Sequence, residues 1–374
     1  MTSVSDLMGY LRAPSDHAPI RIHVGSDTIV CPLDLLCALI VNKGSTEKDI
    51  AALLRDPVSP SDLQKAMDIV AMVRSDQQVD IERLMRDGKY AIQVQEMPNL
   101  SDLVHSSAFI DQILPLSLNT LGCRVVQKLV ESVPPEFVGN IIHQLEKNIV
   151  ECSLDVNGNH VIQKLIDLFP QNSSFIIEGI LSENNLIAKL SLHCYGCRVI
   201  QRLMAKCDID LVAPILESLC SDPATIGTLA NDVFGNYVMQ HALEFGRPMD
   251  KDRISLCLAS MDIVQLGCSK FASNVVEKAI RRAGTESANS VMVTRLMLNA
   301  MLLSTDPVTR EPGIITLMKD RYGNYVVRAV IELGRPEFAA EVDTVKHIIL
   351  DNANTLKKYT FSWHLVERLD KMTE

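Results

Sequence analysis

The sequence predicts an all-α protein built as a helical solenoid, and three observations support this fold class. Apolar residues make up 47% of the chain, yet only 5% of residues are aromatic. A ten-residue segment recurs six times, each time with the apolar spacing of an amphipathic helix. Most copies lie 36 to 39 residues apart, a period typical of helical repeats that bury their apolar faces only against neighbouring repeats.

The six copies begin with a shared pattern, so we number each from the residue after its glycine, or after Ala272 in the fifth copy. They read LGCRVVQKLV, NGNHVIQKLI, YGCRVIQRLM, FGNYVMQHAL, FASNVVEKAI and YGNYVVRAVI. The intervals between successive copies are 36, 38, 39, 37 and 51 residues, measured between the position-1 residues Cys123, Asn159, Cys197, Asn236, Ser273 and Asn324. The long last interval predicts an insertion near residues 284–313. We expect a solvated helix and loop there, with a partner-docking surface as the alternative.

Weaker copies flank the six and set the predicted domain organisation. Upstream, the segment DGKYAIQVQE places Lys89, Tyr90 and Gln93 at positions 1, 2 and 5. Downstream, YTFSWHLVERL is an atypical last copy, as expected of a capping repeat. We therefore predict a diverged helical region or decayed repeats at 1–85, repeats at 86–350, and a C-terminal cap at 351–374. Within the first region, PIRIHVGSD is expected to be a short strand or a loop.

A helical wheel separates two faces of the repeated segment, because a helix advances about 100° per residue. Positions 3, 4, 7 and 8 are apolar in nearly every copy and form the predicted core. Positions 1, 2, 5 and 6 fall on the opposite arc, which an ordinary solvent face would fill with scattered charges. This arc instead holds a narrow set of residue types.

The restricted arc carries groups suited to nucleobases. Position 2 holds flat side chains that stack on bases, and position 5 holds amides that pair with base edges. Basic residues follow at position 6 in four copies, so stacked repeats would form a basic stripe on a chain of net charge −10. The position-2 residues are Arg124, His160, Arg198, Tyr237 and Tyr325, the amides are Gln127, Gln163, Gln201 and Gln240, and the basic residues are Lys128, Lys164, Arg202 and Lys278. A solenoid that binds only protein is the alternative.

These residues resemble the Pumilio, or PUF, family of single-stranded RNA-binding proteins over roughly residues 86–374. The resemblance implies a right-handed crescent of α-helical repeats that binds RNA antiparallel to the chain, usually one base per repeat. It implies uracil contacts by Asn159, His160 and Gln163 and by Asn236, Tyr237 and Gln240, adenine contacts by Cys123, Arg124 and Gln127 and by Cys197, Arg198 and Gln201, and guanine contacts by Ser273, Asn274 and Glu277. Asn324, Tyr325 and Arg328 resemble another uracil set, in which Arg328 replaces the usual Gln. Tyr90 and Gln93 are candidates for a seventh contact, which Lys89 weakens.

Base chemistry agrees with this assignment. An ionised Glu277 supplies acceptors for the N1–H and N2–H donors of guanine, and small residues at position 1 leave room for purines. The expected ligand is therefore single-stranded RNA carrying 5′-UGUAUA-3′, in 3′ untranslated regions of messenger RNAs. The resemblance also implies post-transcriptional repression or decay through effector proteins on the outer face. A relative that binds structured RNA in ribosome assembly is a further alternative.

Other functions find little support in the sequence. A pI near 5.4 argues against indiscriminate binding to nucleic acid or anionic membrane. The chain lacks an apolar run of about 18 residues, so we expect a cytoplasmic monomer with no membrane contact. His193, Cys194 and Cys197 offer one C-x-x-C half-site with no second one to complete it, so we expect no metal and no cofactor. Phosphate-loop, H-E-x-x-H and G-x-S-x-G motifs are missing too, which argues against an enzyme.

Overall fold

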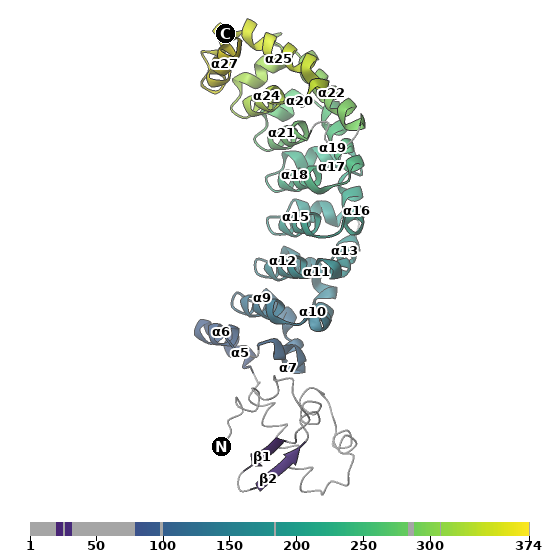
Figure 1. Cartoon of the computed structure of the whole chain (residues 1–374), viewed down its shortest axis with the longest axis vertical. Coiled ribbons are helices and arrows are strands. Elements are labelled where there is room, and N and C mark those ends of the chain that lie inside the picture. The colour runs from purple at the N-terminus through teal and green to yellow at the C-terminus, as the bar shows by residue number, and fades with distance from the viewer. Residues whose placement is uncertain are drawn as a thin grey trace. The chain divides into compact units, whose positions relative to one another are not determined.

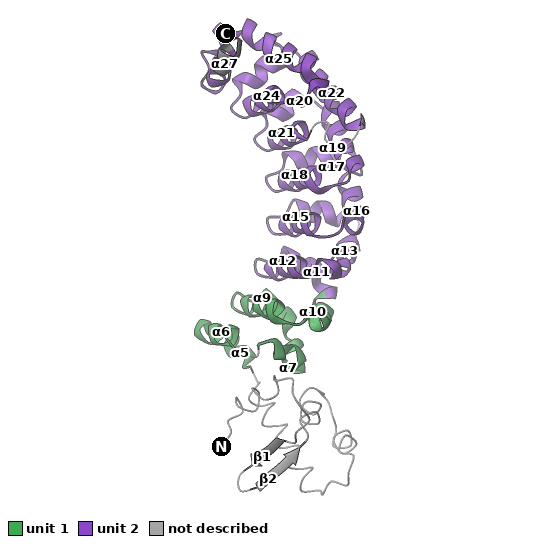
Figure 2. Ribbon diagram, in the orientation of Figure 1, with its two compact units in different colours: residues 1–145 green, residues 146–374 purple. Residues whose placement is uncertain are grey.

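Stacked helices dominate the computed structural model, which describes residues 20–24, 27–31, 79–97, 100–182, 185–282, 288–306 and 308–373 (Figure 1). The chain divides into two compact units, residues 1–145 and 146–374 (Figure 2). The predicted helical-repeat fold is confirmed. No helix in the described residues is both long and apolar enough to cross a membrane.

The first unit contains an antiparallel hairpin of β1 (Ile20–Val24) and β2 (Asp27–Cys31), in which Ile20 pairs with Cys31. Strand β1 agrees with the strand alternative for PIRIHVGSD, and β2 corrects the helical expectation over residues 28–31. Alternating apolar residues and a two-residue Gly-Ser connection in the sequence favour a hairpin at this point. The remainder of the predicted region 1–85, up to residue 78, lies outside the described residues.

The helices of the first unit lead into the first well-formed copy. In order they are α5 (Ile81–Leu84), α6 (Gly88–Gln95), η1 (Leu100–His105), α7 (Ser107–Ile110), α8 (Ile113–Leu118), α9 (Gly122–Ser132), η2 (Pro135–Phe137) and α10 (Val138–Leu145). Helix α9 is the repeated segment, and it packs against both α8 and the degenerate copy α6.

The second unit repeats a pattern of three helices: a short first helix, the recurring segment, and an outer helix. The short helices are α11 (Ile149–Leu154), α14 (Leu186–Ser191), α17 (Pro223–Asn231), α20 (Ile263–Cys268) and α23 (Gly313–Lys319). The recurring helices are α12 (Gly158–Leu168), α15 (Gly196–Lys206), α18 (Gly235–Phe245), α21 (Ala272–Arg281) and α24 (Gly323–Ile331). The outer helices are α13 (Ser174–Leu181), α16 (Ile209–Leu219), α19 (Pro248–Ser260), α22 (Ala288–Leu303) and α25 (Ala339–Asp351). Short elements η3 (Glu146–Asn148), η4 (Pro170–Asn172), η5 (Pro336–Phe338) and α26 (Ala353–Leu356) join them, and α27 (Thr360–Thr373) ends the unit.

The core positions are those that the wheel predicts. In α15, Val199, Ile200, Leu203 and Met204 at positions 3, 4, 7 and 8 are all buried. The other copies follow the same pattern, except that Ile331 at position 8 of α24 is half-buried. Position 1 differs from the prediction, because in five of the six copies its side chain is buried and not open to solvent. The position-1 residues that are at most 5% exposed are Cys123, Asn159, Cys197, Asn236 and Ser273.

A side-chain acceptor before each recurring helix satisfies its first N–H groups, which have no partner within the helix. Asp232 Oδ1 accepts from the backbone N–H of Phe234 and of Gly235, at 2.8 Å each. Asp155 makes the same two bonds before α12, also at 2.8 Å. His193 takes this place before α15, where its Nδ1 lies 3.3 Å from both donors. The histidine that suggested a metal half-site therefore serves as a helix cap.

Removal of the Asp232 cap should destabilise the protein. We expect Asp232→Ala to lower the free energy of unfolding by about 1 kcal/mol, since two helix donors lose their acceptor. Denaturant unfolding measures this loss. Asp343→Ala is the control, because the exposed Asp343 pairs with Lys346 on its own helix α25 and its loss should cost less than about 0.5 kcal/mol. Equal stability of the two variants would contradict the capping role.

The predicted insertion is corrected by α22, which is not a solvated excursion. It packs on α19 as the outer helix of the fifth repeat and buries Val293, Met297, Leu298 and Met301. The length of the insertion was overestimated because the 51-residue interval between Ser273 and Asn324 includes the outer helix α22 as well as the loops that flank it.

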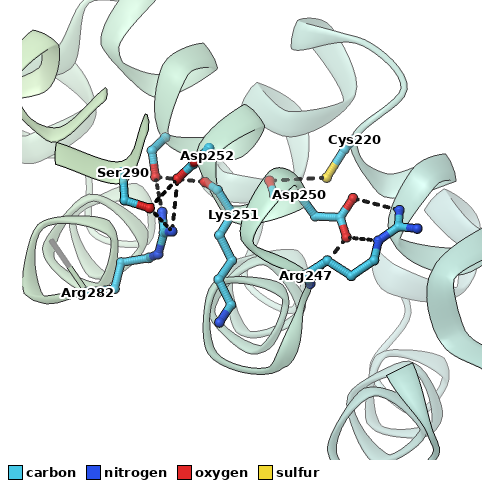
Figure 3. A network of polar contacts seen from close by, with 8 residues as sticks. Cys220, Arg247, Asp250, Lys251, Asp252, Arg282 and Ser290 are labelled. Atoms are coloured by element: carbon cyan, nitrogen blue, oxygen red, sulfur yellow. Dashed lines mark hydrogen bonds and ion pairs between the residues drawn. The ribbon is translucent and has the colours of Figure 1, made fainter. Parts of the chain in front are cut away.

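Polar contacts at the end of α21 tie α22 to α19 (Figure 3). Arg282 donates to Asp252 Oδ1 at 3.0 Å, and Ser290 Oγ on α22 donates to the same oxygen at 2.9 Å. Beside them, Arg247 makes two bonds of 2.7 and 3.0 Å to the buried carboxylate of Asp250. Because the ionised groups in this interface are paired, its buried charges are tolerated.

Candidate nucleic-acid interface

The recurring helices of the second unit form one row, in which α12, α15, α18, α21 and α24 each contact the next (Figure 1). Equivalent positions therefore recur along one surface. Position 2 is exposed throughout this row, and Tyr237 and Tyr325 are 54% and 53% exposed. Exposure of this extent leaves the aromatic rings open to stacking.

In α12 and α18 the position-1 asparagine holds the position-5 glutamine. Asn159 Nδ2 donates to the carbonyls of Asp155 and Val156 at 2.7 and 3.0 Å, so its Oδ1 is the end that accepts from Gln163 Nε2, at 2.8 Å. Asn236 and Gln240 repeat the arrangement with a bond of 3.0 Å. Each glutamine is left with its Oε1 acceptor and one N–H donor.

The copies with cysteine at position 1 hold their position-5 glutamine differently. In α9, Gln127 Nε2 donates to the backbone carbonyl of Cys123 at 3.1 Å, because the thiol is too short to reach it. In α15, burial raises the pKa of the Cys197 thiol, which lies 3.6 Å from the Cys194 carbonyl. Such a thiol stays protonated near neutral pH and is a poor metal ligand. Among the described residues, no group of three or more His, Cys, Asp or Glu side chains is placed to hold a metal ion.

A hollow of about 180 Å³ opens on this surface between three recurring helices. Its lining comes from α12, α15 and α18 and includes position-5 amides from two neighbouring copies. The lining residues are Gln163, Arg198, Gln201, Arg202, Ala205 and His241. The hollow thus brings together residues that the sequence assigns to successive base contacts.

The expected basic stripe at position 6 is largely neutralised, which corrects the prediction. Arg202 lies 3.3 Å from Asp167 on α12, and Lys278 lies 2.8 Å from Glu244 on α18. Lys128 pairs within its own helix with Glu131 at 3.0 Å. The missed signal is position 9, one turn after position 5, where acidic residues recur: Glu131, Asp167, Glu244 and Glu332.

The last two copies also carry a charge at position 5, and of the two only α21 has a basic residue at position 9. In α21, Glu277 occupies position 5 and Arg281 position 9, joined by a bond of 2.8 Å. In α24, Arg328 occupies position 5 and Glu332 position 9, again 2.8 Å apart. Asn324 donates to two loop carbonyls at 3.0 Å each, like the other asparagines. The Arg328 side chain, however, bonds to Glu332 and does not bond to Asn324. Near them, Ser273 is buried and Asn274 exposed, as position 1 and position 2 are elsewhere.

The degenerate copy α6 departs from the repeat. Lys89 is exposed at position 1, and Ile92 at core position 4 is 54% exposed. Tyr90 Oη accepts from the backbone N–H of Asp80 at 3.0 Å, and the Arg83 guanidinium lies 4.5 Å from the centre of its ring. Gln93 is exposed. Because Arg83 already covers the Tyr90 ring, α6 does not offer the open aromatic group of the other copies.

Comparison with known proteins gives a consistent match. A family model described as the Pumilio-family RNA binding repeat matches residues 112–146, 148–181, 187–220, 226–255, 262–292 and 313–340. A Pumilio domain-containing protein of Schizosaccharomyces pombe is 30% identical over 246 residues, which are 65% of this chain and 33% of that protein. Suppressor protein MPT5 of Saccharomyces cerevisiae is 30% identical over 247 residues, 59% of this chain and 28% of that protein. The chain thus spans about a third or less of these curated relatives.

Solved structures agree on the fold. PUF-8 in complex with PBE-RNA has a TM-score of 0.66 at 24% identity, covering 91% of this chain and 93% of that one. The Puf4 RNA binding domain bound to an HO endonuclease RNA 3′ UTR recognition sequence has a TM-score of 0.59 at 26% identity, covering 77% of this chain and 88% of that one. These likenesses extend along most of the helical stack.

Proposed function

Because the chain belongs to the Pumilio family of RNA-binding repeat proteins, we propose that it binds single-stranded RNA sequence-specifically through its recurring helices. The proposed element is 5′-UGUAUA-3′, read from α24 back to α9, one base per helix. The observation that carries the proposal is the matched geometry of positions 1 and 5, which differs between the copies assigned to different bases.

The amide copies suit uracil and adenine. The Gln163 amide, held by Asn159, presents one acceptor beside one donor. Uracil presents the N3–H donor beside a carbonyl acceptor, and adenine presents the N6–H donor beside the N1 acceptor. The amide can therefore pair with either base. The choice between them falls to position 1: Asn159 fills the space that a purine needs, whereas the smaller Cys197 leaves it open.

The fifth copy suits guanine. Glu277 accepts one bond from Arg281 at Oε1, and an ionised carboxylate has lone pairs for several more. Guanine presents two adjacent donors, N1–H and N2–H, which this carboxylate can accept. Adenine has an acceptor at N1 and would be repelled.

Regulation follows from binding in this proposal. A protein that recognises a short element in 3′ untranslated regions acts on the messenger RNA through effector proteins, with repression or decay as the outcome. Solved structures of Puf4 bound to 3′ UTR recognition sequences of Cox17 and HO endonuclease RNA support this choice of target.

A binding titration tests the proposal. The full chain should bind an RNA containing UGUAUA at least tenfold more tightly than one containing ACAAUA, since mismatched bases each cost about 1–3 kcal/mol in specific nucleic-acid complexes. Equal affinity for the two RNAs would refute sequence-specific reading. A second series at rising salt separates base from phosphate contacts, because phosphate contacts weaken both RNAs alike.

A further inference from the structure

Four charged side chains link the helices assigned to the first two bases. Arg281 Nε donates to Glu277 Oε1 at 2.8 Å, and its NH1 donates across to Glu332 Oε2 on α24 at 3.1 Å. Arg328 Nε donates to Glu332 Oε1 at 2.8 Å. The chain Glu277–Arg281–Glu332–Arg328 therefore joins the position-5 residue of α21 to the position-5 residue of α24. We call it the 277–328 chain.

The 277–328 chain alternates in charge and has no net charge. Arg328, and after it Arg281, holds the pKa of Glu332 below its usual range by hydrogen bonding. Glu277 in turn raises the pKa of Arg281. These side chains are partly exposed, between 26% and 50%, so the pairs contribute little to stability through solvent-screened attraction alone. Their effect on orientation is the greater one, because the Arg281 fork fixes two carboxylates at once.

We propose that Arg281 and Glu332 are positioning residues for base reading, Arg281 orienting Glu277 toward guanine and Glu332 holding Arg328 away from the first base. This inference rests on the proposed function of the two helices. Bound at Oε1, the Glu277 carboxylate keeps one rotamer, and Oε2 has no protein partner in the described part of the chain. Glu332 draws the donors of Arg328 aside, so the first base is contacted mainly through Tyr325 and Asn324.

The test measures affinity for RNAs that carry G or A at the second base. Arg281→Ala should lower the wild-type G-to-A affinity ratio by about 3- to 10-fold and leave the ratio for A against G at the fourth base unchanged. Arg281→Lys keeps the charge but not the two-pronged fork, so its G-to-A affinity ratio should lie between those of the wild type and Arg281→Ala. Glu332→Gln should lower the second-base ratio about 2- to 3-fold. It should also steepen the dependence of log affinity on log salt by about 0.7, the value for one additional phosphate contact on a single strand.

Arg295→Ala is the matched control. Arg295 pairs with Glu341 at 2.7 Å between α22 and α25, outside the recurring helices, so its loss should leave all base ratios unchanged. Thermal unfolding confirms that each variant is folded, and Arg281→Lys remains informative if Arg281→Ala is not. A wild-type protein without preference for G would overturn the proposed function and this inference with it. A wild-type preference for G that both Arg281 variants keep within twofold would overturn this inference alone.

Discussion

Glu277→Gln should abolish the proposed preference for guanine at the second base. The glutamine replaces two acceptors with one acceptor and one donor, which leaves a guanine donor facing an N–H group. A well-made bidentate contact contributes about 1–3 kcal/mol of discrimination between bases. We therefore expect the G-to-A affinity ratio to fall about tenfold or more, measured by titration with RNAs that differ only at that base.

The reciprocal change at α15 is the control for this prediction. Gln201→Glu creates the same carboxylate beside Cys197, a position-1 residue small enough for a purine, so preference at the fourth base should move from A toward G. Gln240→Glu places the carboxylate beside Asn236, whose amide is bonded to two loop carbonyls and blocks a purine. It should lose affinity for U without gaining affinity for G. If all three variants only weakened binding uniformly, position 5 would not be the base-reading position.

Periodicity was sufficient to predict the recurring helices and their core because each of these helices has apolar residues at the same positions. Val199 and Ile200 are buried because they lie on the apolar side of their helix, and the sequence of that one helix is enough to identify this side. A helix was also expected where α22 lies, but its burial was not. Its 16 residues share no motif with the other outer helices, and only its packing on α19 identifies it as one.

The details of the candidate site were less predictable from sequence. The bond from Gln163 to Asn159 depends on which carbonyls the asparagine amide has already engaged. The pairing of Arg202 with Asp167 depends on how closely two helices approach, which a single-helix wheel does not contain. The exchange of charge between positions 5 and 9 in the last two copies is visible in the sequence, and Arg281 could have been identified from it.

The glycine before position 1 predicts a further large effect, because the preceding short helix passes very close to it. A Cβ atom added at Gly235 would lie 2.7 Å from the carbonyl oxygen of Leu229 and 3.0 Å from its Cα, so backbone would have to move. We expect Gly235→Ala to lower the free energy of unfolding by about 1–3 kcal/mol, the range for overpacked sites. The displacement begins one residue before Asn236, so affinity for a U at the third base should fall as well. Denaturant unfolding and RNA titration measure the two effects.

Gly139→Ala is the opposing control on α10, where an added Cβ meets nothing within 4 Å. At this exposed position the alanine should stabilise the helix by up to about 1 kcal/mol, since glycine is the poorer helix former. The same chemical change should therefore have opposite signs at the two sites. Ala272 stands in the glycine position of the fifth copy, so its short helix α20 must leave room for a methyl group. Because this methyl group is buried, Ala272→Gly should cost the helix-propensity difference of about 1 kcal/mol and about 0.8 kcal/mol more for the lost burial. If Gly235→Ala were as stable as wild type, close approach of the two helices would not be what requires glycine at the start of five of the six recurring helices.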